Sequence, residues 1–135
     1  MLFISVVLAF TLCGRISAQT MYPTHVGDKM RYTAMIESPK AYLSGICILY
    51  HDTDGVVKGS MFNEFGISAL DFTYNVKKDK VKLHHVVKMM DKWYVRRVLR
   101  RDLRELLHGL RQGKGEYIDS KYHLTYQFVR IADEE

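Results

Sequence analysis

The order of apolar and polar residues along the chain predicts a run of β-strands followed by one helix. Five segments combine alternating or continuous apolar residues with flanking turn residues, which is typical of strands. These segments are 29–37, 41–51, 56–62, 67–74 and 81–87. The second and third are joined through Asp54-Gly55, a pair that supplies the positive φ of a tight hairpin. Short connections between successive strands indicate an antiparallel meander.

The period of the pattern changes in the second half of the chain. From Asp91 to Arg111, valine and leucine recur at every third or fourth position, which indicates an amphipathic helix. We expect Asp91 to be its N-cap and the glycines after residue 112 to end it. After the helix, Tyr117 and the segment 122–131 show alternating apolar and polar side chains, which predicts a last strand or hairpin. The predicted fold class is α+β, with a twisted antiparallel sheet packed on the single helix 91–111.

The first eighteen residues have the pattern of a secretory signal. Leu2 to Leu12 is a mainly apolar run, too short for a transmembrane helix, which needs about 20 residues. We expect cleavage after Ala18, which leaves residues 19–135 as a single β-rich domain without a transmembrane span. Lipidation at Cys13 is an alternative, although Leu12 is larger than the residue that usually precedes a lipidated cysteine. An uncleaved anchor is a third alternative.

Composition excludes a disordered chain and localises the charge. Hydrophobic residues make up 47% and charged residues 26% of the sequence, as in ordinary globular domains. The formal net charge is +5, and the window 88–104 alone holds seven basic and two acidic residues. The rest of residues 19–135 holds 12 basic and 13 acidic residues, and is therefore nearly neutral.

Five arginines form the predicted basic surface of the helix, opposite its leucines. They are Arg96, Arg97, Arg100, Arg101 and Arg104. Their first interpretation is a solvated face that pairs with sheet carboxylates such as Glu37, Glu64 or Asp71. A second is a surface for an anionic membrane or an acidic protein partner. A nucleic-acid surface is the least favoured, because the chain shows an export signal and no nucleic-acid-binding motif.

Catalytic and metal-binding motifs are missing from the sequence. The six histidines lack metal-ligand spacing, and no nucleophile elbow, Walker loop or dinucleotide-binding glycine motif is present. Cys47 lies in an apolar run and is expected to be a small buried side chain. The sequence therefore predicts a protein that is not an enzyme and has no metal or cofactor. An enzyme is the minor alternative, and it would need a cleft in which titratable groups from separate segments converge.

Several segments resemble the central part of bacterial lipoprotein-localisation proteins, the periplasmic lipoprotein carriers and outer-membrane lipoprotein receptors. The resemblance covers about residues 29–130 and rests on four stretches: Gly59–Phe72, Val81–Leu83, Met90–Trp93 and Val98–Leu107. It implies a sheet curled into a half-barrel, with the helix against its concave face. It also implies export to the periplasm or outer membrane of a Gram-negative cell.

The resemblance further implies an apolar cavity that binds acyl chains. The side chains expected to line it are Leu43, Ile46, Ile48, Val57, Phe62, Ile67, Leu70, Phe72, Leu83, Leu124, Tyr126 and Phe128. The chain is shorter than the carriers of that family, which puts a carrier-sized cavity in doubt. Two functions follow: binding of lipid or lipoprotein acyl chains at the cell envelope, or a structural or interaction module with the same fold and a filled interior.

Overall fold

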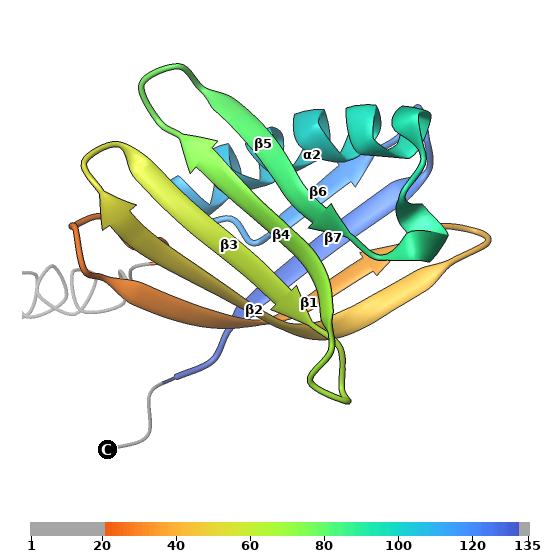
Figure 1. Cartoon of the computed structure of the whole chain (residues 1–135), viewed down its shortest axis with the longest axis horizontal. Coiled ribbons are helices and arrows are strands. Elements are labelled where there is room, and N and C mark those ends of the chain that lie inside the picture. Colours follow the sequence, from red (N-terminus) through yellow and green to blue (C-terminus); the bar gives the residue numbers. More distant parts are fainter. Residues whose placement is uncertain (1–20, 133–135) are drawn as a thin grey trace, which may run out of the picture.

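Within the described part of the chain, seven antiparallel strands form one curled sheet, which packs on a single long helix (Figure 1). The computed structural model describes residues 21–132. The strands are β1 (Lys29–Glu37), β2 (Tyr42–Thr53), β3 (Val56–Phe62), β4 (Ser68–Asn75), β5 (Lys80–Val86), β6 (Glu116–Asp119) and β7 (Leu124–Arg130). A 3₁₀ turn, η1 (Lys88–Met90), precedes the helix α2 (Trp93–Arg111). The predicted α+β half-barrel is therefore confirmed.

The helix bridges the two edges of the sheet. The strand order is β5-β4-β3-β2-β1-β7-β6, so β1 to β5 form a meander, and β7 returns to pair with β1 on its free side. This arrangement leaves β5 and β6 as the edge strands, and α2 contacts both of them (Figure 1). The helix thus lies where strand pairing would close a complete barrel.

The concave face of the sheet is filled along most of its length. Side chains alternate along each strand, and the inward set includes Tyr32, Cys47 and Phe72, all nearly inaccessible to solvent. Five leucines of α2 pack against this face. They are Leu99, Leu103, Leu106, Leu107 and Leu110, each at most 1% exposed. The interior is therefore a packed core where the helix carries leucine.

Three buried tyrosines donate hydrogen bonds from their hydroxyl groups to polar groups around the core. Tyr32 donates to the backbone oxygen of Met21 (2.6 Å), and Tyr74 donates to the Asp79 carboxylate (2.6 Å). Tyr126 donates to Asp102 Oδ2 (2.9 Å). Burial of a hydroxyl group is tolerated when it is hydrogen-bonded, so these contacts keep the large rings inside the core.

The helix begins two residues later than predicted, and Asp91 is not its N-cap. Lys92 occupies that position and makes no capping hydrogen bond with its side chain. The backbone N–H of Asp91 closes the η1 turn on Lys88 O (3.2 Å), so Asp91 belongs to the end of that turn. Its carboxylate instead accepts a hydrogen bond from Arg96 (2.8 Å). The glycine stop is confirmed, since Gly113 follows the helix with φ of +86°.

No helix within residues 21–132 combines the length and the hydropathy needed to cross a bilayer. The expected signal peptide (residues 1–18) and the lipidation candidate Cys13 lie outside the described residues.

Candidate functional site

A groove opens at one end of the half-barrel because the apolar stripe of α2 narrows there. The first fully buried residue of the helix is Leu99. Before it, the core-facing positions are the shorter Val95 and Val98, and both remain partly exposed. Valine is smaller than leucine, so the first two turns of the helix leave space between themselves and the sheet. This space is a groove of about 530 Å³, within the usual size range of small-molecule sites.

Four structural elements form the walls of this end groove. They are η1, the first half of α2, the β1–β2 hairpin and the turn between β6 and β7. The lining residues are Ile36, Ser38, Ala41, Tyr42, Leu43, Met89, Met90, Trp93, Tyr94, Val95, Arg97, Val98, Arg101, Lys121, Tyr122 and Leu124. The hairpin is held by Ser38, whose Oγ accepts a hydrogen bond from Ala41 N (3.0 Å). The groove is therefore mostly apolar and aromatic.

Large apolar side chains at the rim are exposed to solvent. Trp93 is 74% exposed and Tyr94 is 51% exposed, and their rings meet edge to face with centroids 5.7 Å apart. Met89, Tyr42 and Tyr122 are also exposed. Exposed apolar side chains that cluster around a concavity are typical of a binding site rather than of an inert surface.

The groove carries positive charge and no acidic lining residue. Its three cations are Arg97, Arg101 and Lys121. Arg101 forms an ion pair with Asp119 (Nη2–Oδ2, 3.3 Å), whereas the side chains of Arg97 and Lys121 make no ion pair or hydrogen bond within residues 21–132. The guanidinium of Arg101 and the ammonium of Lys121 lie 5.5 Å and 5.4 Å from the centre of the Tyr122 ring. One end of the groove is thus cationic.

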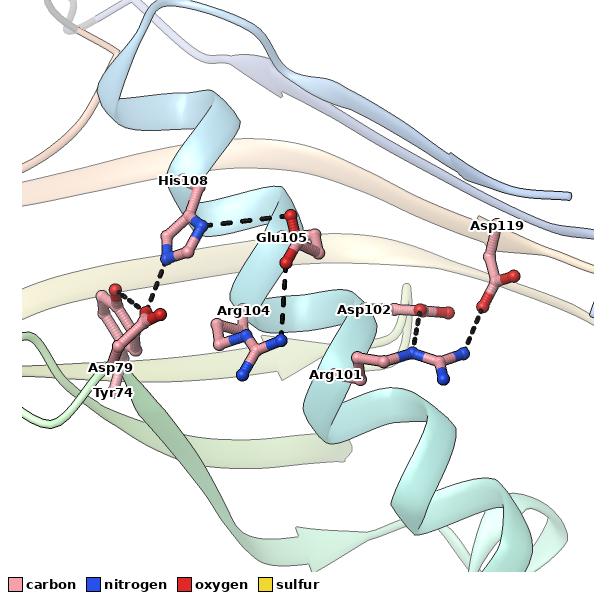
Figure 2. A network of polar contacts seen from close by, with 8 residues as sticks. All are labelled: Tyr74, Asp79, Arg101, Asp102, Arg104, Glu105, His108 and Asp119. Carbon is pink, nitrogen blue, oxygen red and sulfur yellow. Dashed lines mark hydrogen bonds and ion pairs between the residues drawn. The ribbon is translucent and has the colours of Figure 1, made fainter. Parts of the chain in front are cut away.

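A buried pair of carboxyl groups supports this cationic end (Figure 2). Asp102 is fully buried on α2, and burial together with the neighbouring Asp119 raises its pKa to about 7. The pKa of Asp119 is lowered: burial opposes this, but its hydrogen bonds with Asp102, Tyr122 N–H and Arg101 outweigh that effect. Below about pH 7 the folded protein therefore favours a protonated Asp102 beside an ionised Asp119, and Arg101 balances the charge of Asp119.

Asp119 also fixes the turn that carries Lys121 and Tyr122. Its Oδ1 accepts hydrogen bonds from the backbone N–H groups of Lys121 (3.1 Å) and Tyr122 (3.2 Å). An aspartate that accepts from the residues following it is a common way of closing a tight turn. The Asp119 carboxylate thus connects the buried side of α2, where Asp102 lies, to the turn that forms one wall of the groove.

A second polar cluster joins the other half of α2 to the β4–β5 turn (Figure 2). His108 Nε2 lies 2.5 Å from Asp79 Oδ1, which also accepts the Tyr74 hydroxyl hydrogen. Glu105 lies 4.0 Å from His108 Nδ1 and 3.5 Å from Arg104 Nη2. Hydrogen bonds from Tyr74 and His108 lower the pKa of Asp79. Within residues 21–132, no group of three or more His, Cys, Asp or Glu side chains could hold a metal ion.

The predicted cavity residues occupy three different places. Leu43 and Leu124 line the end groove. Val57, Leu70, Phe72, Leu83, Tyr126 and Phe128 lie in the packed core. Ile46, Ile48, Phe62 and Ile67 are not inside the half-barrel. The sequence thus located the concave face at most positions but not the open part of it.

The error at Ile46 and Ile48 has a simple cause. The continuous apolar run 46–50 gives no indication of which alternate side chains point inward. In the structure Cys47 and Leu49 are buried, so Ile46, which is 45% exposed, and Ile48 project from the opposite face with Phe62. Ile67 lies in the loop before β4 and is also exposed.

The five arginines do not form one uniform basic surface. Arg96 pairs with Asp91, Arg101 with Asp119, and Arg104 with Glu105. The three named partners Glu37, Glu64 and Asp71 are wrong. Arg101 does pair with a carboxylate of the sheet, Asp119 at the end of β6, whereas Asp91 and Glu105 belong to the helix region. Arg97 and Arg100 make no ion pair or hydrogen bond within the described chain. Of these two, only Arg97 lines the groove.

The sequence did not single out the aromatic and methionine residues of the groove. Met89, Trp93 and Tyr94 come from segments predicted as a connection or as the start of the helix, and Tyr122 was predicted as the start of the last strand. Trp93-Tyr94, placed directly before the arginines, was the available indication, since exposed aromatic residues beside cations are common in binding sites.

Comparisons of the chain with protein-family models, with curated proteins and with solved structures return no match. The fold and the groove define the protein as a helix-closed half-barrel with an apolar, cationic end groove. The resemblance to lipoprotein-localisation proteins stays a prediction.

Proposed function

We propose that the protein is a non-catalytic binding module of the cell envelope, which takes an acyl chain into the end groove. The observation that carries the proposal is the groove itself, a concavity of about 530 Å³ lined mainly by apolar and aromatic side chains. Export is proposed from the signal-like pattern of residues 1–18.

The packing of α2 supports a site at the end of the half-barrel rather than along its axis. The leucines from Leu99 onward fill the concave face, so a chain enters only where Val95 and Val98 leave space. Burial of a chain there is favourable by about 0.8 kcal/mol per methylene group. Ten buried methylenes contribute about 8 kcal/mol, which exceeds the lower estimate of about 4 kcal/mol for the cost of association and leaves measurable affinity.

The test is displacement of a fluorescent fatty acid such as dansylaminoundecanoic acid. Trp93 is the single tryptophan of the chain and lies on the groove, so it provides a second signal in the same titration. We expect saturable binding, transfer of excitation energy from Trp93 to the dansyl group, and displacement by unlabelled chains. Absence of saturable binding at concentrations below micelle formation would contradict the proposal.

A blocking variant and a matched control locate the binding. Val98→Phe places a larger side chain in the groove and should reduce affinity at least tenfold. Ile46→Phe makes a similar enlargement on the opposite face, where Ile46 is exposed, and should leave affinity unchanged. Circular dichroism and thermal melting establish that both variants are folded. Equal binding by the two variants would place the chain elsewhere.

A structural or interaction module is the second candidate, and the filled interior favours it. On this alternative the groove receives no free lipid, and the protein associates through an edge such as β6, where Ile118 is 58% exposed. A concentration-dependent dimer in analytical ultracentrifugation, combined with no fatty-acid binding, is the expected result for this candidate.

A further inference from the structure

The charged side chains that line the groove all have the same sign. Among the lining residues three are cationic, Arg97, Arg101 and Lys121, and none is acidic. We propose that the ligand is a single-chain carboxylate, whose anionic head group lies at Arg97 and Lys121 and whose tail lies along the valine side of α2. This inference rests on the proposed acyl-chain binding and specifies its chemistry.

Two of the three cations are available to a ligand. Arg101 already has a partner, because its Nη2 lies 3.3 Å from Asp119 Oδ2. Arg97 precedes it by one helical turn, on the same side of α2, and Lys121 comes from the opposite wall. Neither side chain makes an ion pair or hydrogen bond within residues 21–132. A carboxylate between them would form charge-assisted hydrogen bonds, which are stronger than neutral ones.

The remaining lining residues divide between head and tail. Lys121 and Arg101 both lie against the Tyr122 ring, so these two cations lie near the β6–β7 turn, and Arg97 lines the groove one helical turn before Arg101. Apolar side chains such as Val95, Met90 and Ile36 line the rest. A neutral or cationic head group would leave Arg97 and Lys121 without a counter-charge. The arrangement therefore matches an amphiphile with one negative charge at one end of an apolar chain.

The test compares three ligands with the same tail and different head groups: dodecanoate, dodecanol and dodecyltrimethylammonium. Displacement of the fluorescent fatty acid is measured for each ligand at pH 8 and low ionic strength, at ligand concentrations below micelle formation. We expect dodecanoate to bind about tenfold more tightly than dodecanol, and the cation to bind most weakly. The preference should decrease as salt is added, because screening weakens exposed charge pairs.

Matched arginine variants identify the residues responsible. Arg97→Gln combined with Lys121→Gln should weaken dodecanoate binding and bring the affinities for dodecanoate and dodecanol within about twofold of each other. Arg100→Gln removes an exposed arginine of the same helix that does not line the groove, and should retain the full preference.

The possible failures are distinguishable. If no ligand of the series binds, both the acyl-chain function and the head-group assignment are wrong. If dodecanol binds as tightly as dodecanoate, or if the double variant retains the preference, only the head-group assignment is overturned. A last outcome is that the protein sediments with phosphatidylglycerol vesicles but binds no single dodecanoate molecule. If that sedimentation depends on Arg100 as much as on Arg97, the cations belong to a membrane-binding surface and the proposal is overturned.

Discussion

At the scale of single residues, Asp102 is the least expected group in the molecule. It is a carboxyl group with no solvent exposure, on a helix whose other fully buried residues are leucines. The Tyr126 hydroxyl, Arg101 and Asp119 surround it. Because a buried ionised carboxylate is costly, the folded state favours the protonated form of Asp102.

We predict that the stability of the protein decreases between pH 5 and pH 8. The pKa of Asp102 is about 7 in the folded protein, above the ordinary value of 3.8 for an aspartate. Its contribution to stability is therefore complete below about pH 3.8 and is lost progressively as the pH rises to about 7. Asp102→Asn mimics the protonated form and should raise the free energy of unfolding at pH 8 by about 1–3 kcal/mol.

Urea denaturation at pH 5 and pH 8 checks this prediction. The control is Asp54→Asn, which changes an aspartate with a largely exposed side chain in the β2–β3 turn. It should alter neither the stability nor its pH dependence by more than about 0.5 kcal/mol. A wild-type protein that is equally stable at both pH values would show that Asp102 stays ionised in the fold.

At the scale of elements, α2 has two halves with different roles. Its second half contributes four fully buried leucines, whereas its first half contributes valines and arginines to the groove. A helix that packs tightly at one end and loosely at the other can position a binding site without losing its own stability.

We predict that substitutions in the two halves of α2 reduce the free energy of unfolding by different amounts. Leu103→Ala removes a fully buried side chain and should reduce the free energy of unfolding by about 2–5 kcal/mol. Val95→Ala removes a partly exposed side chain beside existing free space, and should cost less than about 1.5 kcal/mol while weakening chain binding. Thermal melting and ligand titration of both variants measure this difference, and equal stability losses would contradict it.

The elements were largely predictable from the sequence, and the site was not. Strand ends marked by Asp54-Gly55 or by charged turns need only local information, and each predicted strand between residues 29 and 87 exists within two residues of its expected ends. The inward direction of Ile46 and the partner of Arg101 depend on contacts between distant segments. The helix start was missed because the η1 turn competes for the backbone of Asp91.

At the scale of the whole molecule, the strands in the centre of the sheet are paired on both sides, whereas one edge strand is short and paired on one side only. Strands β1, β2 and β3 each pair on both sides, whereas β6 has four residues and pairs only with β7. Since local opening is easiest where few interactions are lost, the molecule should open from the β6 edge and the groove, and not from the centre.

Hydrogen exchange followed by mass spectrometry tests this order. We expect the amides of β2 to exchange only through global unfolding, and those of β6 and the turn after it to exchange at least tenfold faster. An acyl ligand in the groove should slow exchange in that turn and in the first half of α2, and leave β4 unchanged. Uniform exchange across the sheet would show that it opens as one unit.

The position of Cys47 gives the molecule a natural reporter of complete unfolding. This thiol lies in the central strand β2 with no solvent exposure, and burial raises its pKa well above the usual value. Both its neighbours in the sheet, Tyr32 and Met61, are buried as well, so no local motion at the edges exposes it. In a Cys13→Ser variant, the rate of Cys47 labelling by a disulfide reagent would therefore follow the global opening reaction and change in step with every stability variant proposed above.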